Sequence, residues 1–238
     1  MGQYAENVYF GKPCGLMDQM GSSVGGAVAI DFADPAAPVV KKVEYDFTRS
    51  GHALCIVDTG SCHADLTDDY ADITREMGAV AARFGEKFLR DVDEGAFRAA
   101  LPQLREECGD RAVLRAMHFF EEDRRAEQEA EALEQGDFDA FLALVDQSGL
   151  SSALNLQNTW SAAAPQQQAI PVALAVGREL LGGSGAIRVH GGGFAGTIQA
   201  FVPNEKLETF RRGMEELLGP GMCHILHIRP QGGCVVLK

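Results

Sequence analysis

The sequence has 238 residues, 46% of them hydrophobic, and a formal net charge of −13 at pH 7. A chain of this length can bury a sizeable core in one or two domains. The acidic balance, without any long cluster of Lys and Arg, excludes the basic surface that nucleic-acid binding requires. No stretch is apolar enough to cross a membrane, and the N-terminus does not resemble a secretion signal. We therefore expect a cytoplasmic protein without nucleic-acid or membrane partners.

The six cysteines show no CxxC spacing and no pairing with histidines that would suggest a metal site. The lack of both patterns is typical of a cytosolic protein whose cysteines stay reduced. Cys55 lies in the apolar run ALCIV and is expected in the core.

Residues 1–65 alternate short β-rich runs with turn residues. Strands are expected at residues 27–32, 39–46 and 53–58, with DPAAP as the turn between the first two. From Thr67 the apolar period changes to that of a helix, which Gly85 ends.

Residues 110–135 predict a long helix that ends at Gly136, and its charged run EEDRRAEQEAEALEQ is interpreted as a solvated face. Asp137 is expected to cap the next helix, and Pro171 to lie in the first turn of a helix that ends at Leu181. Residues 155–169 fit either a loop or the start of a helix.

The last sixty or so residues predict, in order, strand, glycine-rich loop, strand, helix and strand. The strands are AIRVHG, TIQAFVP and HILHIRP, followed by a final VVL. This order predicts an α+β fold with an α/β sandwich. We place a soft domain boundary near residue 65, where strands give way to helices.

Gly191, Gly193 and Gly196 have the spacing of a dinucleotide-binding fingerprint after a strand. That fingerprint needs a helix to follow, whereas the β-branched run TIQAFV follows here. A glycine hairpin or bulge fits this context better.

VDTG, which ends at Gly60, matches the short signature of aspartic proteases. Their chemistry needs two carboxylates, so a homodimer would have to supply the second copy. An ordinary turn at the end of a strand explains Asp-Thr-Gly equally well.

PCGLMDQ, residues 13–19, resembles the segment of galactokinases that carries their catalytic aspartate. Three further segments are similar to galactokinases in the same order: VDTG with His63 and Tyr70 after it, ALEQGDF at 132–138, and RVHGGGFAG at 188–196. The four segments extend over most of the chain. They make it similar to galactokinases, in the GHMP family of kinases for galactose, homoserine, mevalonate and phosphomevalonate.

The resemblance implies a fragment, the last three-fifths or so of such an enzyme, without the family's first sugar-binding motif and its ATP phosphate loop. Residues 1–65 would then be the remainder of an N-terminal catalytic domain with a mixed sheet. Residues 66–238 would be the C-terminal GHMP kinase domain, a ferredoxin-like α/β sandwich with added helices. The fragment is expected to be inactive, and its unpaired strands are expected to favour self-association.

The family's reaction transfers the γ-phosphoryl group of ATP, with Mg²⁺, to the anomeric hydroxyl of galactose and gives galactose 1-phosphate. By resemblance, Asp18 would accept the hydroxyl proton or orient the nucleophile. Gly15 would place backbone against the sugar, and Tyr70 would donate its phenol hydrogen to a sugar hydroxyl. The glycines near the phosphates would be Gly191, Gly192, Gly193 and Gly196. No metal ligand is assigned in this chain.

Several positions depart from the galactokinase pattern. Ile73 and Thr74 stand where galactokinases usually have an arginine pair, Ala195 where glycine is usual, and Thr197 where cysteine is common. The stretch SSALNLQNTW lacks the arginine and acids often found there. Two alternatives therefore stay open: a GHMP kinase for another sugar, such as a sugar acid or amino sugar, and a non-catalytic sugar sensor.

Overall fold

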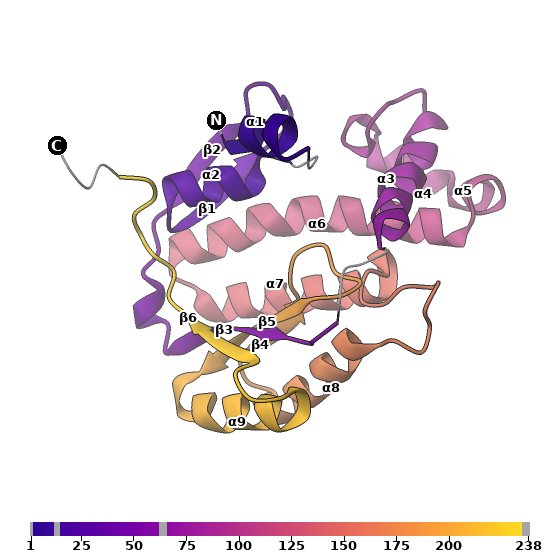
Figure 1. The fold of residues 1–238 in the computed structure, drawn as a ribbon. Helices are drawn as coiled ribbons and strands as arrows, with labels where there is room; N and C mark the ends of the chain where they lie inside the picture. Colours follow the sequence, from indigo (N-terminus) through magenta and orange to yellow (C-terminus); the bar gives the residue numbers. More distant parts are fainter. Residues whose placement is uncertain (1, 12–14, 62–65, 235–238) are drawn as a thin grey trace.

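A computed structural model of the chain describes residues 2–11, 15–61 and 66–234. The N-terminal part consists of short helices and a β-hairpin (Figure 1). Its elements are α1 (Gly2–Tyr4), η1 (Ala5–Tyr9), α2 (Met17–Val24), β1 (Ala27–Asp31) and β2 (Val39–Val43). β1 and β2 pair antiparallel over five residues each and form a sheet of their own.

A second, four-stranded sheet has the spatial order β4-β5-β3-β6, and all of its neighbours are antiparallel. Its strands are β3 (His52–Asp58), β4 (Ala186–Val189), β5 (Thr197–Pro203) and β6 (Cys223–Leu226). With helices between β3 and β4 and one helix between β5 and β6, this is the βαββαβ order of a ferredoxin-like sandwich. The predicted α+β class is therefore confirmed.

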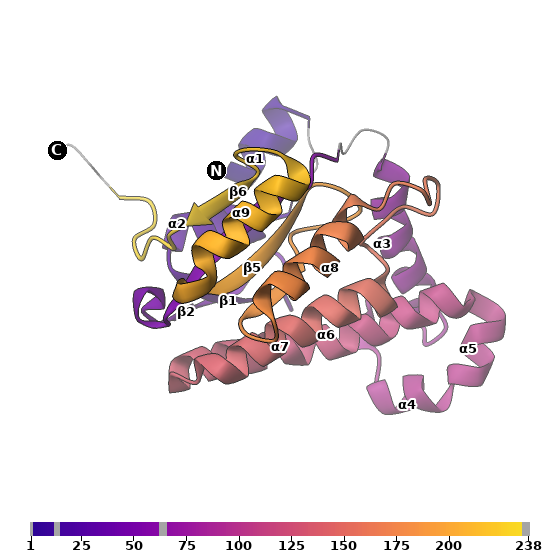
Figure 2. The same ribbon diagram turned by 90° about the horizontal axis from the view of Figure 1, so that it is seen from below.

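Helices cover both faces of this sheet (Figures 1 and 2). On one face lie α8 (Ala169–Leu181) and α9 (Leu207–Leu218), whose buried side chains pack on those of β3, β4 and β5. On the other face lie α6 (Asp110–Gln135) and α7 (Phe138–Ser151), where Phe141 and Phe201 meet edge to face. Alternate residues of β3, β4 and β5 thus enter two different cores, as the pleat of a strand requires.

A third core joins the long helix α6 to a cluster of shorter helices. These are α3 (Thr67–Ala82), η3 (Leu89–Asp91), α4 (Glu94–Ala99) and α5 (Leu101–Cys108). Figure 1 shows that α6 runs beneath both this cluster and the β1–β2 hairpin. The remaining short elements are η2 (Phe47–Arg49), η4 (Ser152–Leu156) and η5 (Asn204–Lys206).

Most predicted elements are present, with shifted ends. The long helix ends where the left-handed Gly136 stops it, and the Asp137 side chain accepts the hydrogen bond of Ala140 N at the start of α7. The second predicted strand ends at Val43, and the strand expected at HILHIRP covers only Cys223–Leu226. The final VVL and His63 lie outside the described residues.

Besides the helices before β1, the helices α4 and α5 were not predicted from the sequence. Their local signals are short: Asp93 caps Ala96 N at 2.7 Å, and Pro102 lies in the first turn of α5. Each helix is under nine residues long and gains its stability from Phe97 and Leu104, which are buried in the third core.

The predicted division near residue 65 assigns β3 to the first domain. In the structure β3 lies between β5 and β6, in the sheet formed by the second part of the chain. The boundary stays a prediction, and a position between β2 and β3 fits the strand pairing better. Within the described ranges, no helix is long and apolar enough to cross a membrane.

We expect the centre of the sheet to dominate stability. Ile198 of β5 is fully buried, so Ile198→Ala should lower the free energy of unfolding by about 2–5 kcal/mol in urea denaturation. Ile225 of β6 is 40% exposed, and Ile225→Ala should cost about 1 kcal/mol or less. Equal losses in the two variants would contradict the assignment of the core to the β4–β5–β3 side.

Candidate active site

The glycine-rich segment forms the connection of the antiparallel hairpin β4–β5. Gly191, Gly193 and Gly196 have φ values of 66°, 80° and 90°, and Phe194 between them has φ 61°. Positive φ is a conformation that glycine adopts readily and phenylalanine rarely does. A strand follows this loop, so the hairpin interpretation holds and no helix N-terminus faces a pyrophosphate here.

Tyr70, in the first turn of α3, reaches this loop from a distant part of the chain. Its Oη donates a hydrogen bond of 2.8 Å to Gly193 O, and its ring meets that of Phe194 edge-on at 5.3 Å between centroids. Burial, and then the charge of Asp69, raise the pKa of Tyr70. The single phenol hydrogen of Tyr70 is donated to Gly193 O in this structure, and the predicted contact of Tyr70 with a sugar hydroxyl stays a prediction.

The VDTG turn holds the far end of the same loop. Thr59 donates from its backbone N at 2.9 Å and from Oγ1 at 2.7 Å to Gly196 O, and Gly196 N donates to Ser61 Oγ at 3.1 Å. The Asp58 carboxylate accepts the hydrogen bond of Gly60 N at 2.8 Å. Asp58 therefore acts as a turn residue in this structure, as the ordinary interpretation of Asp-Thr-Gly expects.

Asn158, which sequence reasoning did not single out, holds the middle of the loop. Its Nδ2 donates to Gly192 O at 3.0 Å, and its backbone O accepts from Phe194 N at 2.5 Å. It is 2% exposed, and the residue before it, Gln157, has a left-handed φ of 57°. The only signal in the sequence was a polar residue in a stretch that departs from the galactokinase pattern.

Asp18 lies in the first turn of α2 and is exposed. Its charge acts on His190, the residue before the glycine loop: desolvation and Arg188 lower the pKa of His190, and Asp18 works in the opposite direction. No hydrogen bond or ion pair joins Asp18 to His190 among the described residues, so this effect acts through charge alone. Gly15 is exposed just before α2, and within the described residues no hydrogen bond joins either residue to Tyr70.

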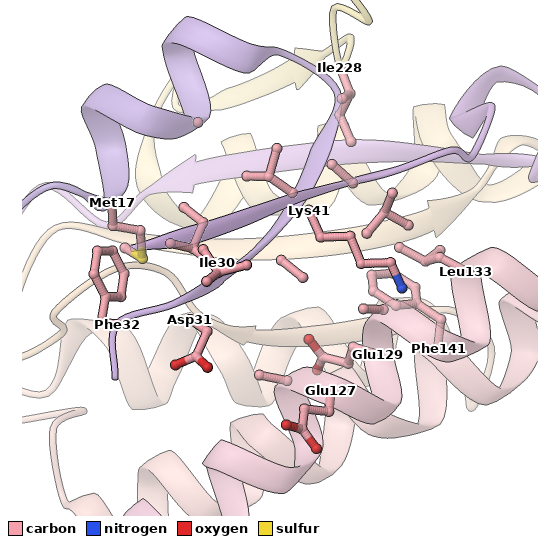
Figure 3. Close-up of a pocket in the computed structure, with 18 of the residues that line it drawn as sticks. Met17, Ile30, Asp31, Phe32, Lys41, Glu127, Glu129, Leu133, Phe141 and Ile228 are labelled. Atoms are coloured by element: carbon pink, nitrogen blue, oxygen red, sulfur yellow. The ribbon is translucent and has the colours of Figure 1, made fainter. Parts of the chain in front are cut away.

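A cavity of about 950 Å³ opens beside Asp18, between the β1–β2 hairpin and α6. Figure 3 shows Ile30, Asp31 and Lys41 of the hairpin on one side of it and Glu129 of α6 on the other. Lys41 is paired with Glu134 at 2.7 Å, and Asp31 with Arg90 at 2.8 Å.

The charged run of α6 is only partly solvated, which corrects the sequence interpretation. Arg125 is 8% exposed and pairs with Glu122, which also accepts a hydrogen bond from Ser148. Glu129 Oε1 is buried and has no hydrogen-bond partner among the described residues. Burial, opposed by Arg188 and Arg125 and reinforced by Glu122, raises the pKa of Glu129 to about 7. The helix thus directs one polar stripe toward the sheet and the cavity.

The described residues offer no ready-made cluster of metal ligands, although a magnesium ion beside a nucleotide needs only one or two protein carboxylates. In the part of the chain that the structure describes, no three His, Cys, Asp or Glu side chains gather in a way that could hold a metal. The glycine loop also lacks a helix N-terminus that would face phosphates.

The fold is shared with a solved galactokinase. The crystal structure of Lactococcus lactis galactokinase complexed with galactose superposes with a TM-score of 0.70 at 21% sequence identity, over 97% of this chain and 58% of that one. No protein-family model matches the sequence.

Proteins with similar sequences are also named galactokinase. The galactokinase of Mannheimia succiniciproducens is 32% identical over 214 residues, which are 89% of this chain and 52% of that protein. The galactokinase of Streptomyces coelicolor is 30% identical over 90% of this chain and 52% of its own length. The predicted resemblance is confirmed: the chain is similar in sequence to galactokinases and spans about half the length of the curated proteins it matches.

The raised pKa of Glu129 gives stability a pH dependence. The ordinary pKa of this carboxyl is 4.5, and its pKa in the folded chain is about 7. At pH values between these two, the folded chain keeps a proton on Glu129 that the unfolded chain has lost. The free energy of unfolding should therefore fall as the pH rises from about 4.5 to about 7, by up to about 3 kcal/mol, and then level off.

Glu129→Gln should remove this decline, so that the variant is more stable than the unsubstituted chain at pH 8. The measurement is urea denaturation at several pH values between 4.5 and 8. Glu127→Gln, an exposed residue of the same cavity, is the control and should leave the decline in place. The same decline in the Glu129→Gln chain would show that another group causes it.

Proposed function

We propose that this chain supplies one wall of a sugar-kinase site in a longer protein. That protein would transfer the γ-phosphoryl group of ATP to the anomeric hydroxyl of galactose and give galactose 1-phosphate. The main support is the hydrogen bond from Tyr70 to Gly193 O, which joins two galactokinase-like segments that lie 123 residues apart in the sequence. In a third such segment, the charge of Asp18 acts on His190, the residue before that loop.

Each residue of the candidate site would have its own role in the reaction. Asp18 would accept the proton of the anomeric hydroxyl or orient it, which requires a carboxylate within about 3 Å of that oxygen. Tyr70 would accept a hydrogen bond from a second sugar hydroxyl, and Gly15 would let the backbone approach the sugar. The loop glycines would lie near the phosphates: Gly191, Gly192, Gly193 and Gly196.

ATP with Mg²⁺ would supply the phosphoryl group, and its main binding motifs would come from outside this chain. In phosphoryl transfer, positioning and charge neutralisation provide most of the rate. This chain would carry the general base and the sugar contacts only, so we do not expect it to catalyse phosphoryl transfer alone.

The first test uses a protein in which this chain is joined to the missing half of a galactokinase. Asp18→Asn should lower kcat by about 10²- to 10⁴-fold and change the KM for galactose much less, because the amide cannot take the proton. The assay follows ADP release with galactose, galacturonate and galactosamine, so that the preferred sugar is identified in the same experiment. Asp34→Asn, an exposed turn residue, is the control.

Unchanged turnover in the Asp18→Asn protein would remove Asp18 from the catalytic role. The chain of 238 residues by itself should show no phosphorylation in the same assay. Robust ATP-dependent turnover by this chain would overturn the proposal that it supplies only one wall.

We further propose that the isolated chain associates with itself through the β1–β2 hairpin. Among the described residues no third strand pairs with this hairpin, and Val39 on β2 is 67% exposed. Unpaired strand edges readily bind another strand. Sedimentation velocity should show oligomers that grow with concentration and weaken in Val39→Lys, whereas a monomer at all concentrations would contradict the proposal.

A further inference from the structure

We infer that Asn158 is a positioning residue, which fixes the glycine loop and, through the loop, Tyr70. This inference rests on the proposed function in one respect: the loop and Tyr70 would face the substrate of the proposed reaction. The contacts themselves stand without it.

Asn158 contacts three consecutive residues of the loop. The side-chain amide donates to Gly192 O at 3.0 Å, and the backbone O accepts from Phe194 N at 2.5 Å. Between these two, Gly193 packs so tightly that an added Cβ would lie 2.1 Å from Asn158 O. The loop can therefore neither shift away from Asn158 nor take a side chain at its centre.

Through the loop, these contacts of Asn158 also fix the position of Tyr70. Phe194, whose backbone is held by Asn158, is 6% exposed and meets the ring of Tyr70 edge-on. The phenol of Tyr70 returns to the loop at Gly193 O. An added Cβ on Gly192 would lie 2.7 Å from Tyr70 Cε1, so the ring rests directly on the loop. Asn158, Phe194, Tyr70 and Gly193 form a closed ring of contacts.

The chemistry of Asn158 favours a role in positioning over one in stability. A carbonyl can only accept, so the atom that faces Gly192 O must be the amide nitrogen, and the oxygen points elsewhere. That oxygen, Oδ1, is buried and has no partner among the described residues. Left-handed backbone at both Gln157 and Phe194 adds strain at the same contact. Strained conformations of this kind persist only where surrounding contacts hold them, so the bonds of Asn158 act on the shape of the loop.

The test measures Tyr70 in the chain itself and needs no substrate. Asn158→Leu keeps the branched shape of the side chain and removes its donor and acceptor. Tyrosine is labelled with ¹³C at Cζ, and the Tyr70 resonance among the four tyrosines is identified by its absence in Tyr70→Phe. Burial is the main cause of the raised pKa of Tyr70, so a loosened loop that admits water should let Tyr70 titrate at lower pH.

Asn155→Leu is the matched control. Asn155 lies three residues earlier, is half-buried and bonds to Ser151 Oγ at 3.4 Å, and among the described residues no hydrogen bond joins it to the loop. Its variant should leave the Tyr70 titration unchanged. In Asn158→Leu we also expect the Phe194 amide to exchange with solvent roughly tenfold faster, while the melting temperature changes little.

An unchanged Tyr70 titration in a folded Asn158→Leu chain would overturn the inference, as would an equal shift in Asn155→Leu. If the leucine variant does not fold, Asn158→Ser is measured by the same criterion. Because the readout is a titration, the loss of the Asp18 proposal would not affect it, and its own failure would leave the kinase proposal standing.

Discussion

The pairing of β3 with β5 is the constraint on which the site depends. Seven residue pairs, from His52 with Pro203 to Asp58 with Thr197, fix the register of two strands that are far apart in the sequence. This register places the VDTG turn directly beside the glycine loop, where Thr59 can donate twice to Gly196 O. A slip of one residue would turn Val57 and Ile198 from the core toward the opposite face. The core and the loop anchor are therefore specified together.

Much of the fold was predictable because its signals are local. The apolar period of residues 67–82, the stop at Gly136 and the cap at Asp137 each act within a few residues of the helix they define. The short helices α4 and α5 escaped prediction because their stability comes from Phe97 and Leu104 in a shared core rather than from a long periodic pattern. Strand pairing is also non-local, so no local pattern indicated that β3 would lie between β5 and β6.

The candidate site was predictable as a list of residues but not as a geometry. Resemblance pointed to Tyr70 and to the glycine loop, yet no spacing rule says that the phenol hydrogen goes to Gly193 O. The charged run of α6 was interpreted as solvated because its composition hides a stripe of period 3.6, in which Arg125 and Glu129 turn inward. Asn158 was missed because a buried amide has no sequence signature apart from its partners.

The two parts of the site differ in how firmly they are held. On the loop side, left-handed conformations at Gln157 and Phe194 cost on the order of 1–3 kcal/mol each and persist only because surrounding contacts over-determine them. That side is organised before any ligand arrives, which is the condition for catalysis by positioning. Asp18, by contrast, is exposed on an eight-residue helix, and its carboxylate bonds to none of the described residues. The loop and Tyr70 are thus fixed by their own contacts, whereas no bond among the described residues fixes the position of the Asp18 carboxylate.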